Sequence, residues 1–269
     1  MKNNFKRTTI LSMIITIAVL TATLGGLLIP NLYQDNAFLK AIWISNDYIT
    51  LIVGLPLLVI AMLLYHKTKS LKALLVWFSS IWFMFYNYAY YLFGSSFNPF
   101  FLIYIIIFCL SLVVLMVDLG NLPLETIKKS IQNKLPVKTI AGYMFFIAIG
   151  LTVVYTGQSI NFITAGTLPS IVTLSGHVTS VVFILDFAMV ITLFVISGVL
   201  LLKRNPWGYV GALMLNIKGV LYMSVLTFAA LRTNPQETGL WALLGTLSLV
   251  VTVLLMLHHN DVLLTKDSK

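Results

Sequence analysis

Two residues with full charges, Asp186 and Lys218, lie inside long apolar stretches of the sequence. A charge at the centre of a membrane-spanning helix costs about 2.5–3.5 kcal/mol on insertion scales, and such residues usually belong to an ion, proton or substrate pathway. An aspartate can bind a cation or a proton there, and a lysine can bind an anion or a carboxylate. The two residues therefore predict a polar site for a small molecule or an ion inside a bundle of helices.

The depths of these two residues do not favour a direct ion pair. Asp186 lies six residues from the end of its apolar stretch, about 9 Å deep at 1.5 Å per residue. Lys218 lies thirteen residues from the end of its own stretch on the same side of the membrane, about 20 Å deep. Helical side chains also lean toward the N-terminus of their helix, which separates the two further. An ion pair requires one helix to slide or tilt, so two separate polar stations are favoured.

Other polar residues could complete the site. Tyr222 lies one helical turn from Lys218, where its hydroxyl can accept a hydrogen bond or share a proton. Asn87 lies at about the depth of Asp186, so the two side chains could meet, and Tyr91 follows Asn87 on the same face of its helix. The sequence thus adds Tyr222, Asn87 and Tyr91 to the candidate pathway.

Most of these residues also have a structural interpretation. Asn87 could be a hydrogen-bonding contact between helices, worth about 0.6–2 kcal/mol. Asp186 could reach interfacial water or be protonated. Lys218 is the hardest to explain in this way, because it lies far from either end of its stretch. The remaining candidates are tyrosines typical of an aromatic belt at the membrane surface: Tyr86, Tyr88, Tyr90 and Tyr91.

Motifs for enzymatic or metal chemistry are absent from the sequence. It contains no HExxH, GxSxG, P-loop or GxGxxG, and its single cysteine, Cys109, excludes an intramolecular disulfide. His66 and His258 could in principle ligate a haem or a metal together, but a solvated helix end is the simpler interpretation. His177 precedes the stretch of Asp186 and could exchange protons with it, which is the one argument for an enzyme. No cofactor is indicated.

The elements that must position these residues are membrane-spanning helices. Hydrophobic residues make up 59% of the 269 residues and charged residues only 9%, against about 25% in soluble domains. Each apolar stretch is about long enough to cross a bilayer, and backbone pairing in lipid requires helices. We therefore predict an all-α, polytopic transmembrane helical bundle with about eight spans. The predicted spans are residues 8–29, 49–65, 71–93, 98–117, 139–156, 180–202, 209–231 and 240–258.

Basic residues indicate the orientation of the bundle. Fourteen Lys and Arg residues fall on one side of the predicted spans, whereas Lys40 and Arg232 alone fall on the other. The excess of positive charge predicts a cytoplasmic (inner) membrane protein with both termini in the cytoplasm. The first stretch is too long for a cleavable signal, so we expect it to remain as a helix. The net charge of +9 does not indicate nucleic-acid binding, because the basic residues are dispersed over loops.

The order of loops divides the chain into three parts. We expect a first four-helix half in residues 1–118, a connector in 119–138 and a second four-helix half in 139–269. The similar order of loops suggests that the two halves are parallel repeats. The connector predicts an amphipathic helix on the inner leaflet, with apolar residues from Leu124 to Leu135 and lysines near anionic lipids. The outer segment 157–179 is too apolar for a free loop and is expected to lie in the membrane interface or to cover the bundle as a lid. The oligomeric state is not indicated.

Several segments resemble those of a broad group of uncharacterised bacterial polytopic integral membrane proteins. They are NDYITLIVGLPLL at the start of the second span, YNYAYYLFG-SSFNPFFLIY across the third and fourth, ILDF in the sixth, and WGY followed by NIKG in the seventh. The resemblance supports the topology and adds Asp47 to the residues of interest. It implies no activity, substrate or cofactor.

The sequence therefore favours a transporter or binding protein for a small molecule or an ion. The alternative is a membrane scaffold or sensor partner, in which the polar residues only hold the bundle together. The two hypotheses differ in what the substitution of Asp186 and Lys218 does. It abolishes activity under the first and changes only stability under the second.

Overall fold

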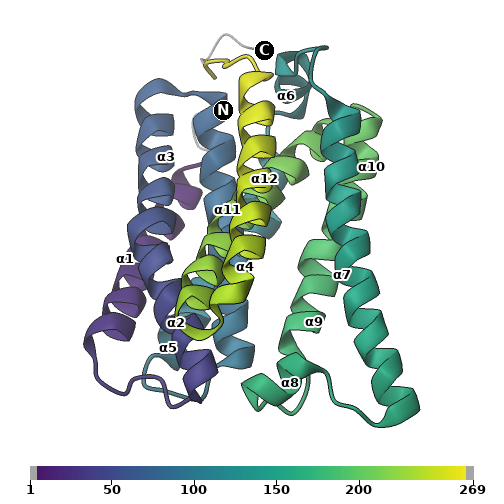
Figure 1. Cartoon of the computed structure of the whole chain (residues 1–269). Helices are drawn as coiled ribbons and strands as arrows, with labels where there is room; N and C mark the ends of the chain where they lie inside the picture. The colour runs from purple at the N-terminus through teal and green to yellow at the C-terminus, as the bar shows by residue number, and fades with distance from the viewer. Residues whose placement is uncertain (1–4, 265–269) are drawn as a thin grey trace.

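The computed structural model describes residues 5–264, and this part of the chain is a bundle of helices (Figure 1). Within it, strand pairing is limited to two isolated bridges. The α-helices are α1 (Lys6–Leu28), α2 (Ala37–Ile49), α3 (Leu55–Thr68), α4 (Leu71–Gly94), α5 (Phe101–Val113), α6 (Leu124–Ser130), α7 (Val137–Ala165), α8 (Ser170–Ser175), α9 (Val181–Asp186), α10 (Thr192–Leu202), α11 (Pro206–Thr233) and α12 (Thr238–Leu257). Three π-helical turns are η1 (Thr50–Gly54), η2 (Val114–Asp118) and η4 (Phe187–Ile191), and two 3₁₀ turns are η3 (Leu119–Asn121) and η5 (Pro235–Glu237).

Seven helical segments within the described residues are long and apolar enough to cross a membrane. Three of them contain a π-helical turn: α2 continues through η1 into α3, α5 through η2 into η3, and α9 through η4 into α10. The eighth long helix, α4, is less apolar because tyrosine, serine and asparagine interrupt it. The all-α transmembrane bundle is therefore confirmed, and the chain is a multi-pass membrane protein.

The two most enclosed helices, α4 and α11, lie in the middle of the bundle and contact each other (Figure 1). In its most apolar part, α11 has 61% of its residues buried, compared with 17% for the span of α12. Each central helix also packs against a helix from the other half of the chain, α4 against α9 and α11 against α2. Polar side chains on α4 and α11 are therefore surrounded by protein rather than by lipid.

The second span begins twelve residues earlier than the predicted 49–65, at Ala37. The side chain of Asn36 caps this start by accepting a hydrogen bond from the backbone N–H of Leu39 at 3.0 Å. The sequence prediction was wrong here because Lys40 and Asp47 lower the local hydropathy. As a consequence, Asp47 lies within a continuous helical span and not at its entry.

The fifth span also exceeds its predicted range of 139–156, because α7 continues to Ala165. Much of the predicted outer lid is therefore helix. The helix ends at Gly166, whose φ of +70° is a left-handed conformation that favours glycine. The rest of the segment folds back onto α2, where the Asn36 amide donates to the carbonyl oxygens of Leu174 (2.9 Å) and Ser175 (3.0 Å).

The connector contains a helix, but a shorter one than predicted. Helix α6 ends at Ser130, and the apolar side chains of Ile127 and Leu135 are buried against the protein. The helix contacts α11. Its apolar residues thus pack on the end of the bundle instead of facing a lipid leaflet.

Both ends of the chain lie at the same end of the bundle, together with α6 (Figure 1). We call this the basic end. Here residues 258–264, the C-terminal strap, run between the α3–α4 turn and the segment after α6. Backbone hydrogen bonds hold the strap: Leu71 N to Val262 O (3.0 Å), Leu264 N to Lys69 O (2.9 Å), Gln132 N to His258 O (2.9 Å) and Asn260 N to Ser130 O (2.9 Å).

An imidazole within the strap makes stability depend on pH. His259 is buried, stacks on the ring of Tyr209 at 5.1 Å, and has no hydrogen-bond partner for either ring nitrogen among residues 5–264. Burial, with a contribution from Lys72 that Asp261 opposes, lowers the pKa of His259 to about 4. Between its ordinary pKa of about 6.5 and this value, the unfolded chain binds a proton that the folded chain does not. Stability due to neutral His259 is therefore present above pH 6.5 and is lost as the pH falls toward 4.

We expect the apparent melting temperature in detergent to fall over this pH range. His259→Phe keeps a ring against Tyr209 but cannot titrate, so its melting temperature should fall less. His258→Phe, a change at the neighbouring histidine, is the control and should behave as the wild type. Identical curves for the wild type and His259→Phe would contradict the assignment.

Candidate functional site

The polar part of the bundle is built on α4. Tyr86, Tyr88, Tyr90 and Tyr91 are each at most 3% exposed, so the aromatic-belt interpretation of these tyrosines is wrong. Because successive residues of a helix point about 100° apart, the same segment reaches helices on several sides. It contacts α9 and α11 as well as the helices next to it in sequence.

The first candidate centre is at Asp186, the last residue of α9 before η4. Its carboxylate is buried and accepts hydrogen bonds from the hydroxyls of Tyr86 (2.7 Å) and Tyr155 (2.6 Å). Tyr155, on α7, was not among the predicted residues. Its ring stacks on that of Phe183, one turn before Asp186 in α9, with 4.1 Å between centroids. The carboxylate thus receives one donor from each half of the chain.

Lys218 and Asp186 both contact the side chain of Tyr86. The single ion pair among residues 5–264 joins Arg7 and Asp118, so the predicted lack of a direct Asp186–Lys218 ion pair is confirmed. The ammonium nitrogen of Lys218 lies 3.6 Å from the ring centre of Tyr86. The Tyr86 side chain therefore contacts the ammonium with its ring and the carboxylate with its hydroxyl. We call this arrangement the Asp186–Tyr86–Lys218 centre.

Tyr222 also contacts Lys218, but with its ring and not with its hydroxyl. The ammonium nitrogen lies 4.7 Å from the Tyr222 ring centre, and the rings of Tyr222 and Tyr86 meet edge to face at 5.2 Å. Aromatic rings attract a desolvated cation by roughly 2 kcal/mol. The two rings therefore hold a buried ammonium group that makes no hydrogen bond to the described part of the protein.

Asn87 does not meet Asp186, contrary to the prediction. Its amide bonds with the side chains of Asn46 (2.5 Å) and Thr50 (3.3 Å), both in the second span. It follows Tyr86 in sequence and so points to a different neighbouring helix. The structural interpretation of Asn87, a hydrogen-bonding contact between helices, is confirmed.

A second buried carboxylate, Asp47, forms a centre of its own. It is 1% exposed and accepts hydrogen bonds from the hydroxyls of Tyr33 (2.6 Å) and Tyr91 (2.8 Å). Tyr91 thus contacts a carboxylate, but it is Asp47 and not Asp186. Tyr33, which lies in the loop after α1, was not predicted, because nothing in its local sequence distinguishes it from other tyrosines. We call this arrangement the Asp47 centre.

His177 lies away from both carboxylates. Its Nε2 atom is 2.7 Å from the carbonyl oxygen of Gly94, at the C-terminal end of α4. The side chain therefore anchors the segment after α8 to the end of a central helix. The predicted proton exchange with Asp186 has no direct contact to support it.

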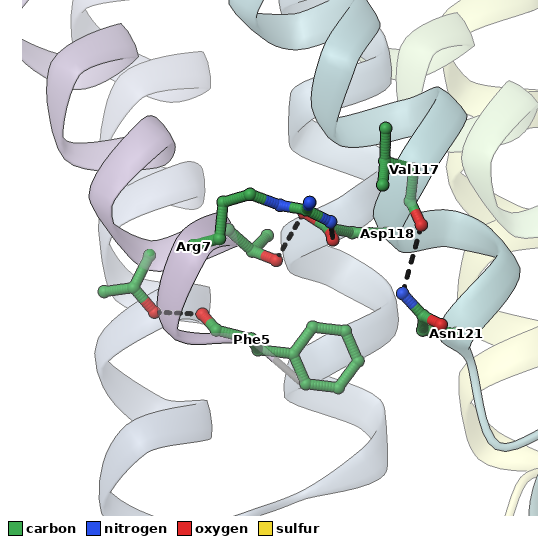
Figure 2. A network of polar contacts seen from close by, with 7 residues as sticks. Phe5, Arg7, Val117, Asp118 and Asn121 are labelled. Carbon is green, nitrogen blue, oxygen red and sulfur yellow. Dashed lines mark hydrogen bonds and ion pairs between the residues drawn. The ribbon is translucent and has the colours of Figure 1, made fainter. Parts of the chain in front are cut away.

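Asp118 is a third buried carboxylate, which lies one residue beyond the predicted fourth span of 98–117. It ends η2 at the basic end and is fully buried. Figure 2 shows Arg7 of α1 reaching its carboxylate, which also accepts a hydrogen bond from Thr8 at 2.8 Å. This ion pair joins the first and fourth spans. Because Arg7 is half-exposed, we regard the ion pair as a structural contact.

The two histidines considered for a metal make local contacts instead. His66 Nε2 lies 2.8 Å from the hydroxyl of Thr9, and His258 Nδ1 lies 2.9 Å from the carbonyl oxygen of Leu254. Within residues 5–264, no group of three or more His, Cys, Asp or Glu side chains could hold a metal ion.

The chain was compared with protein-family models, curated proteins and solved structures, and nothing in any of the three matches it. The resemblance to bacterial integral membrane proteins stays a prediction.

Proposed function

We propose that the protein transports a small carboxylate-bearing solute together with a proton, and that the Asp186–Tyr86–Lys218 centre binds both. One observation carries the proposal. Opposite charges are buried near the middle of the bundle, and a tyrosine holds them apart. A pair that served only stability would gain most from direct contact, because removing each ion from water costs several kcal/mol.

The chemistry of the two stations suggests their roles. No acidic side chain of the described residues forms an ion pair with Lys218, so the carboxylate of a solute can pair with its ammonium group. That pairing leaves the buried carboxylate of Asp186 without a counter-charge, which a co-transported proton can supply. Solute and proton are therefore expected to bind together, which is the requirement for coupled transport.

The backbone next to Asp186 supports a role in movement. The π-helical turn η4 begins at the following residue, Phe187. Such turns interrupt the regular hydrogen bonding of a helix and are frequent at functional sites. A change in this turn would move Asp186 relative to Tyr86. We further propose that the basic end faces the cytoplasm of a bacterial cell, in agreement with the excess of Lys and Arg there.

The test uses the purified full chain reconstituted into liposomes that contain a pH-sensitive dye. Alanine, lactate and succinate are added outside under an imposed membrane potential, and protein-free liposomes give the background. We expect at least one of them to acidify the lumen in wild-type liposomes. Lys218→Met and Asp186→Asn should reduce this signal to background.

Two control variants test whether transport is lost because the Asp186–Tyr86–Lys218 centre is changed or because any charge is removed. Lys40→Met and Asp261→Asn remove the same types of charge elsewhere, and both variants should retain the wild-type rate. Wild-type rates in both centre variants would overturn the proposal. Background rates for all three solutes in the wild type would also overturn it and would favour the scaffold or sensor alternative.

A further inference from the structure

The Asp47 centre plays no part in the proposed transport reaction, and its charge is not balanced. The carboxylate is 1% exposed, and the one ion pair of residues 5–264 lies elsewhere, at Asp118. A buried charge without a partner of opposite sign costs several kcal/mol. The centre therefore favours a bound positive charge.

Hydroxyl and carbonyl oxygen atoms lie next to the Asp47 carboxylate. The hydroxyls of Tyr33 and Tyr91 lie 2.6 and 2.8 Å from the two carboxylate oxygens of Asp47. The Tyr91 hydroxyl also lies 3.2 Å from the carbonyl oxygen of Trp43, although it has only one proton to donate. Carboxylate, phenol and carbonyl oxygens together form a set of hard ligands, which suits a hard cation.

The aromatic cluster around this centre has polar atoms without partners. Among the described residues, the hydroxyls of Tyr88 and Tyr104 and the indole N–H of Trp43 are buried and make no hydrogen bond. Their rings pack against the ring of Tyr91, with centroids 5.3, 5.0 and 4.8 Å away. Buried polar groups are normally satisfied, so the unpaired hydroxyl oxygens of Tyr88 and Tyr104 are available to an additional occupant of this cluster, whereas the indole N–H of Trp43 cannot bind a cation.

The backbone also approaches the carboxylate in an unusual way. A Cβ atom on Gly26 of α1 would overlap Asp47 Oδ2 and the Tyr33 hydroxyl, so only glycine fits there. Three residues after Asp47, the π-helical turn η1 begins, and the backbone N–H of Thr50 is shared between two carbonyl groups. Irregular backbone at membrane depth recurs at the ion sites of transporters.

We propose that the Asp47 centre binds one monovalent alkali cation, with Na⁺ as the expected ion. The charge favours a monovalent ion, because one carboxylate and one such ion are neutral, whereas a divalent ion would leave a buried positive charge. The oxygens lie at hydrogen-bond distance from one another and must separate to admit an ion, so the smaller Na⁺ is expected in preference to K⁺. This inference does not depend on the proposed transport, because binding can be measured on the isolated protein.

The experiment measures binding of ²²Na⁺ to the purified full chain in detergent at fixed pH, by equilibrium dialysis. N-methyl-glucamine chloride keeps the ionic strength constant. We expect one saturable ion per chain, with binding lost in Asp47→Asn and weakened about 10–100-fold in Tyr91→Phe. Glu125→Gln, which removes an exposed carboxylate in α6, should bind Na⁺ as the wild type does.

A second variant tests the site without changing a charge or a ligand. Gly26→Ala places a methyl group where the carboxylate lies, so it should weaken ²²Na⁺ binding while the protein remains monodisperse. Absence of saturable binding in the wild type would overturn the proposal, as would unchanged binding in Asp47→Asn. Thermal stability that responds to pH but not to Na⁺, K⁺ or Li⁺ would instead assign the centre to a proton. Failure of the transport proposal would leave these results unchanged, since that proposal rests on Asp186 and Lys218.

Discussion

Replacing Asp186 by asparagine is expected to destabilise the protein by about 3 kcal/mol, because the change leaves a buried ammonium group without a counter-charge. Lys218 is 4% exposed, and its ammonium group lies against the rings of Tyr86 and Tyr222 without an ion pair to the described residues. Asparagine also accepts the tyrosine hydrogen bonds more weakly than a carboxylate does. The loss should appear in the free energy of unfolding, measured by reversible SDS unfolding at pH 7.5.

The reverse change should be similarly costly. In Lys218→Met, Asp186 retains the hydroxyl donors of Tyr86 and Tyr155, but its buried carboxylate loses the nearest positive charge. We expect this variant to lose about 3 kcal/mol as well, and Asp186→Asn combined with Lys218→Met to lose about 2 kcal/mol less than the sum of the two single changes. Additive effects in the double variant would show that Tyr86 does not couple the two charges.

Gly208→Ala is expected to destabilise the protein by about 3 kcal/mol through a backbone clash. Gly208 lies in the first turn of α11, where its missing side chain lets α10 approach. A Cβ atom there would overlap the backbone of Leu200 and Leu201, which cannot move aside as a flexible side chain can. The two helices would have to separate at the turn that joins them.

The matched control is Gly150→Ala in α7. A Cβ atom at Gly150 has nothing within 4 Å, and alanine stabilises a helix by roughly 0.8–1 kcal/mol relative to glycine. Both changes add one methyl group. Compared with the wild type, the free energy of SDS unfolding should be lower in Gly208→Ala and higher in Gly150→Ala. A neutral Gly208→Ala would show that α10 and α11 are not in close contact.

Much of the fold could be predicted because hydropathy reports the contact of a helix with lipid. Prediction from hydropathy failed where a span contacts protein, as the second span shows. Lys40, Asn46 and Asp47 lower its hydropathy, yet Asn46 and Asp47 are buried against other helices. The start of the span at Ala37 therefore depends on tertiary contacts, and the hydropathy of neighbouring residues in the sequence gives no information about such contacts.

The candidate site was predicted in its charges but not in its connections. The constant rise of a helix predicted different depths for Asp186 and Lys218, and the absence of a direct ion pair agrees with this, but the predicted separation into two stations was wrong because both residues contact Tyr86. The bridge by Tyr86 depends on α4 lying between α9 and α11, and the donor from Tyr155 on α7 lying beside α9. Such neighbour relations are properties of the assembled bundle.

The low hydropathy of α4 has a consequence for biogenesis. A helix with three tyrosines and an asparagine between Tyr86 and Tyr90 gains little from entering lipid alone, because each buried polar group loses its water. The following span, Phe101–Asn121, has the highest mean hydropathy of the chain's spans at 2.8, and a short turn joins the two. Helices α4 and α5 are thus suited to leave the translocon as one hairpin. Tyr91 already has its partner Asp47 in the preceding span, but Tyr86 lacks Asp186 and Lys218 until α9 and α11 have been synthesised, so the last spans complete the burial of the third.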